Sequence, residues 1–202
     1  MVSRRKCQFI TSSASWATGL MTLLFFGAAW AQGNLSVEFR PAANQVLGNP
    51  GSAGLNHGGG FEAVAAYRFA PPIAVYAGWG ANTFATEASL AGANTNFVET
   101  GYTFGIGLMQ GIRNSPLSII MRGGGVYNHL EVKSTGGDLI ADSGFGLGWQ
   151  IETGLAIAVG RRWKLIPGIR YHQLSRNIVI GATDTKIDLS YLSLGLGVNW
   201  QF

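Results

Sequence analysis

Large apolar residues alternate with small or polar residues along much of the chain, most regularly near its end. From residue 192 to residue 202 every second position is large and apolar, and the positions between them carry Ser, Gly, Asn or Gln. A period of two places successive side chains on opposite faces, so this segment is predicted to be a strand with one apolar face. About 5–6 residues are usual for a strand of a soluble sheet, whereas roughly 9–11 tilted residues cross a bilayer. The strand predicted over 186–202 therefore suits a transmembrane β-barrel.

The same alternation recurs earlier in the chain and predicts eight strands in total. They are expected over 35–40, 61–69, 73–80, 97–109, 117–128, 144–159, 163–172 and 186–202. The connections alternate between long segments (41–60, 82–96, 129–143 and 173–185) and short turns (70–72, 111–116 and 160–162). This arrangement is typical of an all-β, eight-stranded antiparallel up-and-down transmembrane barrel whose four long loops share one rim. The fifth strand has the least regular pattern, because Gly123, Gly124 and Gly125 interrupt it.

The charged residues of the predicted strands fall on the face opposite to the large apolar residues. This inner set is Glu38, Arg40, Glu62, Arg68, Glu99, Arg122, Glu152, Lys164 and Arg170, with His172 at its edge. Most strand glycines share that face, and an eight-stranded barrel is only wide enough inside for side chains. Acids and bases are nearly matched, as they must be where an unpaired buried charge costs several kcal/mol. We therefore expect a lumen filled by an ion-pair network, which disfavours an open channel; a soluble lipocalin-like barrel would need the opposite sidedness.

Aromatic residues on the apolar face separate into two bands. Phe39, Phe61, Trp79, Tyr102, Tyr127 and Tyr171 are expected toward the long-loop rim, and Phe69, Trp163, Trp200 and Phe202 toward the short-turn rim. Two bands of this kind are the aromatic girdles that lie at the two membrane interfaces of a barrel.

The first residues of the chain have the pattern of a secretory signal. Arg4, Arg5 and Lys6 precede an apolar run, and Ala29-Trp30-Ala31 fits a cleavage site, so we expect residues 1–31 to be removed and residues 32–202 to form the barrel domain. Removal leaves 11 Lys and Arg against 10 Asp and Glu, which gives no electrostatic reason for a nucleic-acid partner. The single cysteine, Cys7, lies in the removed segment.

With its signal peptide, eight alternating strands, long loops on one rim and terminal Phe202, the chain resembles small eight-stranded outer-membrane proteins of the OmpA-barrel, OmpX and opacity-protein type. The resemblance implies a multi-pass monomer in the Gram-negative outer membrane, in contact with lipid and lipopolysaccharide. It implies extracellular long loops, periplasmic termini and a structural or surface-interaction role with an unknown extracellular ligand. It also implies that Val198, Trp200 and Phe202 belong to a signal read by the barrel-insertion machinery during assembly.

Some barrels of this size are lipid A-modifying enzymes, so the alternative is a deacylase-like serine esterase. That family carries a His and a Ser near the end of the penultimate strand, where this chain has His172 and Ser175, and Asp184 or Asp188 would orient the base. Three residues of separation place His172 and Ser175 on opposite faces of a regular strand, so a bulge would be needed. No catalytic set is therefore favoured.

No metal site or cofactor is predicted. His57, His129 and His172 lie on three different segments without a paired ligand spacing. Asp138 and Asp142 in the third long loop are candidates for contact with calcium or lipopolysaccharide cations, although solvated loop acids are commoner.

Overall fold

The structure is a computed structural model that describes residues 34–47, 55–86, 95–134, 136–180 and 183–202. The strands in these ranges are β1 (Leu35–Leu47), β2 (Leu55–Ala70), β3 (Ile73–Thr86), β4 (Thr95–Gly111), β5 (Leu117–Ser134), β6 (Leu139–Asp142), β7 (Gly146–Ala158), β8 (Trp163–Ile180) and β9 (Thr183–Gln201). No helix long and apolar enough to cross a membrane occurs among the described residues. The predicted signal peptide, residues 1–31, lies outside them.

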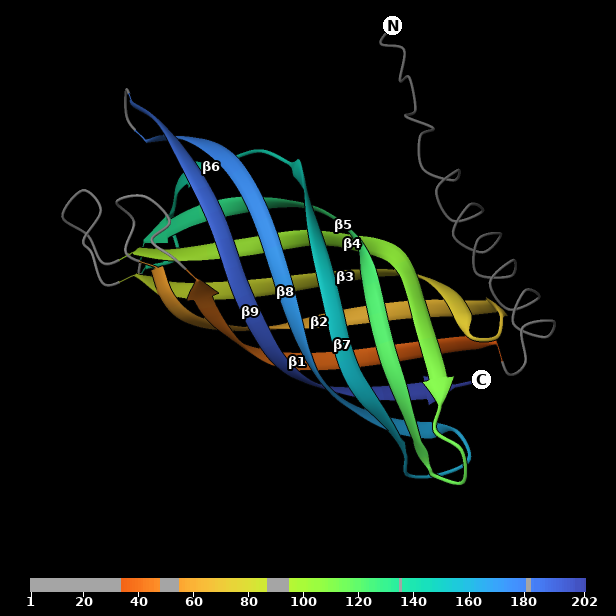
Figure 1. Ribbon diagram of the computed structural model, residues 1–202. Helices are drawn as coiled ribbons and strands as arrows, with labels where there is room; N and C mark the ends of the chain where they lie inside the picture. Colours follow the sequence, from red (N-terminus) through yellow and green to blue (C-terminus); the bar gives the residue numbers. More distant parts are fainter. Residues whose placement is uncertain (1–33, 48–54, 87–94, 135, 181–182) are drawn as a thin grey trace, which may run out of the picture. The chain divides into compact units, whose positions relative to one another are not determined.

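Eight of the strands form one closed ring in which each strand pairs with its two neighbours. The first and last strands, β1 and β9, pair antiparallel, and the pairing of β4 with β5 completes the ring. The short strand β6 stands apart from the ring and pairs with the end of β5 (Figure 1). The described chain is therefore an all-β, eight-stranded antiparallel up-and-down barrel, which confirms the predicted fold class.

The strands run further than predicted at the end that carries the long connections, here called the long-connection end. The opposite end, with the connections β2–β3, β4–β5 and β7–β8, is called the short-turn end. β1 continues to Leu47 and β8 to Ile180, and only residues 181–182 separate β8 from β9. The prediction of a long loop over 173–185 was therefore wrong. The other three long connections are also shorter than predicted, and β6 lies within the segment 129–143 that was expected to be a loop.

The outer surface of the barrel wall is strongly apolar. Ile106 on β4, Leu147 on β7 and Leu194 on β9 are 57%, 68% and 67% exposed, and many other large apolar side chains of the ring strands are exposed as well. Soluble monomers rarely expose contiguous apolar patches larger than a few hundred Å². The sidedness predicted for β9 is observed, since Leu196 and Val198 are exposed whereas Gly195 and Asn199 are buried.

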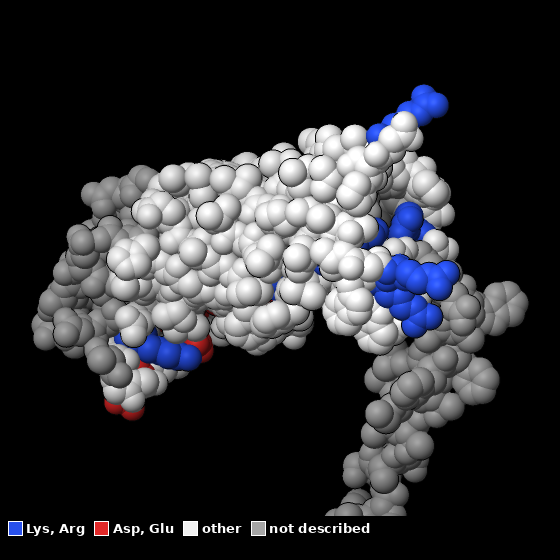
Figure 2. Space-filling model, turned by 90° about the horizontal axis from the view of Figure 1, so that it is seen from below, with Lys and Arg blue, Asp and Glu red and all other residues white. Residues whose placement is uncertain are grey.

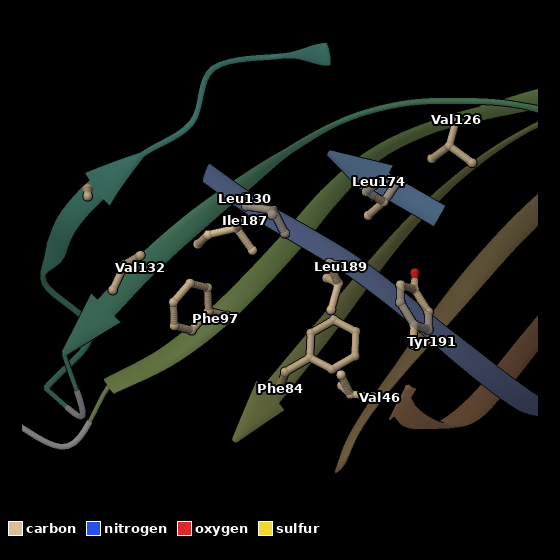
Figure 3. Close-up of a cluster of buried hydrophobic side chains, with 11 residues drawn as sticks. Val46, Phe84, Phe97, Val126, Leu130, Val132, Leu174, Ile187, Leu189 and Tyr191 are labelled. Atoms are coloured by element: carbon tan, nitrogen blue, oxygen red, sulfur yellow. The ribbon is translucent and has the colours of Figure 1, made fainter. Parts of the chain in front are cut away.

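The interior contains a cluster of apolar side chains at the long-connection end, here called the apolar plug (Figure 3). It consists of Val46, Phe84, Phe97, Val126, Leu130, Val132, Ala141, Leu174, Ile187, Leu189 and Tyr191. A smaller cluster of Ile120, Ala156 and Ile166, with Met109 packed against it, comes from the short-turn half of the strands. The strand lengths were underestimated because the prediction assumed apolar residues outside, whereas Val46, Phe84 and Leu174 continue their strands with apolar side chains inside.

Candidate functional site

Three arginines and three glutamates from five strands meet in the lumen between the two apolar clusters. This ion cluster consists of Glu38 and Arg40 on β1, Glu62 on β2, Arg122 on β5, Glu152 on β7 and Arg170 on β8. Each of these residues is at most 8% exposed. The three positive and three negative charges balance, which a buried cluster requires because an uncompensated buried charge is strongly destabilising.

Glu152 is at the centre of the ion cluster and contacts all three arginines. Its carboxylate oxygens lie 2.6 Å from Arg40 Nη1, 2.9 Å from Arg170 Nη2 and 3.6 Å from Arg122 Nη1. The register explains two of these contacts, because Arg122 and Arg170 are the direct cross-strand partners of Glu152 on β5 and β8. Arg40 comes from β1, which β8 and β9 separate from β7. It forms ion pairs with both Glu152 and Glu38 and so connects the two carboxylates.

Glycines on the inner face leave room for these long side chains. A Cβ at Gly195 would lie 2.8 Å from Arg40 Cδ, and a Cβ at Gly107 would lie 3.3 Å from Arg122 Cγ. Real Cβ atoms essentially never approach as closely as the first of these values, so a side chain at Gly195 would displace Arg40. Glycine at these two positions therefore leaves the space that Arg40 and Arg122 occupy.

Three residues of the predicted ion-pair network lie outside the ion cluster. Glu99 is buried and accepts hydrogen bonds from neutral groups, namely Tyr191 Oη at 2.6 Å, Asn82 Nδ2 at 3.4 Å and Asn128 Nδ2. Arg68 and Lys164 are half-buried toward the short-turn end, and neither forms an ion pair with any described residue. Lys164 Nζ donates to Met109 Sδ at 3.4 Å.

The inner-face residues that escaped the sequence analysis include Arg176 and Tyr191. Arg176, which fell in a predicted loop, is 5% exposed and donates to the carbonyl oxygen of Leu147 at 3.0 Å and to Asn128 Oδ1. Tyr191 is completely buried and its ring stacks on that of His172, with centroids 4.5 Å apart. The alternation of inner and outer positions could have identified both residues. Arg176 lies four residues beyond His172, and Tyr191 lies two residues before Ser193, so an even spacing places each on the inner face.

His172 and Ser175, the pair proposed for an esterase, lie on opposite faces of β8. His172 is buried in the lumen, whereas Ser175 is exposed on the outside and donates to Asp188 Oδ1 at 2.5 Å. The register of β8 with β9 is continuous from Trp163 to Ile180, so no bulge brings the two residues to one face. His172 Nδ1 has no hydrogen-bond partner among the described residues. The side chain of Asp184 lies outside the described part of the structure. The geometry therefore does not assemble this catalytic pair.

Aromatic side chains form two rows on the outside of the barrel. In the long-connection aromatic row, Trp79, Tyr102 and Tyr127 are direct cross-strand partners on β3, β4 and β5. The rest of this row is Phe39, Phe61 and Tyr171, with Trp149, which the sequence analysis omitted, contacting Tyr171 at 5.3 Å between centroids. The short-turn aromatic row consists of Phe69, Trp163, Trp200 and Phe202, in which Trp163, Trp200 and Phe202 stack successively. All of these residues are at least partly exposed on the outer surface.

Beyond the long-connection aromatic row polar residues become common on the outer face, although Leu47, Leu139 and Ile140 are exposed there as well. Its exposed residues include Gln45, His57, Thr83, Gln173, Ser175 and Asp188. On the face shown in Figure 2 the barrel wall is almost free of charged atoms between its ends, and most of the visible Lys and Arg gather at one end. The exposed arginines of the short turns are Arg113, Arg161 and Arg162. The outer surface is therefore an apolar belt between two ends at which polar and charged residues are more frequent.

A closed antiparallel barrel with an apolar outer belt defines the chain as a membrane β-barrel, and comparison with known proteins specifies the kind. Residues 17–202 match the family of the outer membrane protein beta-barrel domain, and the chain belongs to this family. Membership of this family indicates that the protein is located in the bacterial outer membrane. No curated protein matches the chain.

Solved structures with the same fold include one surface protein and two outer-membrane proteins. Neisserial surface protein A is 20% identical with a TM-score of 0.60, covering 83% of this chain and 97% of its own. OprG from Pseudomonas aeruginosa is 14% identical with a TM-score of 0.53, covering 85% and 98%. AlkL, solved in DMPC lipid bilayers, is 15% identical with a TM-score of 0.54, covering 100% and 97%. Identities this low show a shared fold and do not transfer a ligand or an activity.

Proposed function

We propose that the protein is an outer-membrane barrel with a closed, charge-filled lumen that has a structural or surface-interaction role at its long-connection end. The observation that carries this proposal is the stacking of the ion cluster and the apolar plug inside one narrow ring. Both consist of side chains that are 9% exposed or less. An eight-stranded barrel has no spare width for a channel beside them.

The two layers oppose conduction for different physical reasons. A path through the ion cluster requires separation of charges that are paired in a low-dielectric interior, and each unpaired charge there costs several kcal/mol. A path through the apolar plug requires displacement of Phe84, Phe97 and Leu189, which are completely buried. Exposure of each such side chain costs about 1.5–3 kcal/mol. Ions would therefore meet two independent barriers.

The ion cluster also supports the proposed structural role. It links β1, β2, β5, β7 and β8, so its contacts tie strands on different sides of the ring to one another. The hydrogen-bond ladder connects each strand only to its neighbours. Cross-lumen ion pairs therefore resist flattening of the barrel in a way that the ladder alone does not.

The proposed orientation places the long-connection end outside the cell and both termini of the barrel in the periplasm. Phe202 N–H donates to the carbonyl oxygen of Leu35 at 3.0 Å, so the two ends of the described barrel meet at the short-turn end. The polar outer face beyond the long-connection aromatic row suits contact with lipopolysaccharide sugars and water. Val198 and Trp200 point outward on β9 and Phe202 directly follows it, where the barrel-insertion machinery would read them during assembly.

Planar-bilayer recording tests the closed lumen. The folded protein is expected to give no steady open current, because neither the ion cluster nor the apolar plug leaves a continuous aqueous path. Steady currents from the native barrel, at a protein concentration where an empty-detergent control is silent, would contradict the proposal.

Labelling of single cysteines on intact cells tests the orientation. In a Cys7→Ser background, Ser175→Cys should react with a membrane-impermeant maleimide, whereas Arg161→Cys should react only after the outer membrane is opened. Both positions are exposed, so accessibility of the side chain itself is matched. The reverse labelling pattern would invert the proposed topology and leave the closed lumen unaffected.

A further inference from the structure

Three side chains with metal-ligand atoms gather on the outside of the barrel where β6 pairs with β5. His129 and Glu131 lie two residues apart on β5 and therefore on one face of the strand. Asp142 ends β6 and is the direct cross-strand partner of Glu131. One nitrogen or oxygen atom of each side chain lies within 4.8 Å of the others. The sequence analysis missed this group because Asp142 is thirteen residues from His129. The two side chains meet only because β5 and β6 pair as an antiparallel hairpin.

Two of these side chains are already held in position. His129 Nδ1 lies 3.0 Å from Asp142 Oδ2, and the other oxygen, Asp142 Oδ1, accepts the Gly144 N–H at 2.6 Å. The ring of His129 stacks on Phe145, with centroids 4.5 Å apart and planes 21° apart. Outer contacts of this kind orient the ligands of protein metal sites. His129 Nδ1 and Asp142 Oδ2 therefore face each other before any ion binds.

The third side chain, Glu131, is held aside by a competing cation. Like charges directly opposite each other on paired strands are destabilising, and Glu131 and Asp142 are such a pair. Lys133 Nζ lies 2.7 Å from Glu131 Oε2 and offsets one of the two charges. A divalent ion between the two carboxylates would offset both of them at once.

We propose that His129, Glu131 and Asp142 form a binding site for a divalent transition-metal ion, with Zn²⁺ as the best match. Calcium and magnesium prefer sets of oxygen ligands, whereas imidazole nitrogen with carboxylate oxygens suits zinc. In a tetrahedral zinc site with bonds of about 2.0–2.1 Å, donor atoms are roughly 3.3 Å apart. His129 and Asp142 are close to that spacing, and Glu131 completes the set by turning away from Lys133. Water takes the fourth position, and the proton between His129 and Asp142 is released.

The bound ion would fasten the hairpin to the barrel. Within the described structure β6 has four residues and pairs with β5 alone, so it is weakly anchored. Bonds from one ion to His129 and Glu131 on β5 and to Asp142 on β6 cross-link the two strands. This site is independent of the closed lumen and of the proposed orientation.

Calorimetric titration of Zn²⁺ into the folded protein in detergent tests the site. One Zn²⁺ per chain is expected, and His129→Ala should weaken binding at least about tenfold, the usual effect of disturbing the surroundings of a metal. His57→Ala is the matched control, because His57 is another histidine at the long-connection end and is exposed. Unchanged affinity in His129→Ala, equal loss in both variants, or no saturable binding would overturn the proposal.

Lys133→Met provides a test in the opposite direction. Removal of the competing ammonium group should tighten zinc binding severalfold, whereas Glu131→Gln should weaken it. Circular dichroism of each variant checks that the barrel is folded. If Lys133→Met does not increase the affinity for zinc, Glu131 is not a ligand and the three-residue site is overturned.

Discussion

Two zones of this barrel have opposite sidedness. Between the two aromatic rows, apolar residues such as Leu196 lie outside and the ion cluster lies inside. Beyond the long-connection aromatic row, polar residues such as Ser175 and Asp188 lie outside and the apolar plug lies inside. The inversion occurs within continuous strands, so it does not depend on a change of backbone.

The difference shows that the surrounding solvent decides which face is apolar. In lipid the outer face must be apolar, and the lumen takes the polar groups, which then need partners. In water the hydrophobic effect drives large apolar side chains into the interior, and polar side chains remain on the outer face. We therefore infer that lipid surrounds one part of the barrel axis and water surrounds another.

Removal of Glu152 should have the largest effect on the membrane zone. Glu152→Ala leaves three buried arginines against two glutamates, and breaking such a buried set costs about 3–5 kcal/mol of unfolding free energy. Urea unfolding of the barrel in lipid vesicles, followed by tryptophan fluorescence, measures this. Arg113→Ala, on an exposed short turn, is the control and should change stability little. A loss of less than 1 kcal/mol for Glu152→Ala would mean that the interior of this zone is well hydrated.

A pair of leucines on β9 compares the inside of one zone with the outside of the other. Leu189→Ala in the apolar plug should cost about 2–5 kcal/mol, because the lost burial is joined by a cavity. Leu194→Ala, on the exposed apolar face, should cost less because lipid chains fill the vacated space. The same vesicle unfolding assay applies. Equal losses would indicate that the plug is loosely packed.

Charges added to the outer face locate the boundary between the zones. Leu196→Arg lies midway along β9 between the aromatic rows and should cost roughly 2–4 kcal/mol, the usual value for arginine at the bilayer midplane. Ser175→Arg, beyond the long-connection aromatic row, should cost about 0–1 kcal/mol. If both substitutions destabilise the barrel equally, the extension lies within the membrane and the proposed division is wrong.

Alternation in the sequence was sufficient for the fold in the membrane zone. The pattern from Leu192 to Phe202 predicts a strand, its length and its lipid-facing side, and the strand is observed with that sidedness. The same rule failed beyond the aromatic row. There Phe84 and Leu174 turn inward, so a pattern read as apolar outside gave loops in place of strands.

The sequence by itself determined the class of this protein, because period-two alternation over bilayer-length segments is a local property of each strand. Only the tertiary structure decided the pairings. Ring closure joins Arg122 to Glu38, which are 84 positions apart, and strand register sets Ser175 outside and His172 inside. It likewise brings Asp142 beside His129. These contacts depend on which strands are neighbours and on the register in which they pair. The folding free energy of the whole ring, not of any single strand, selects that arrangement.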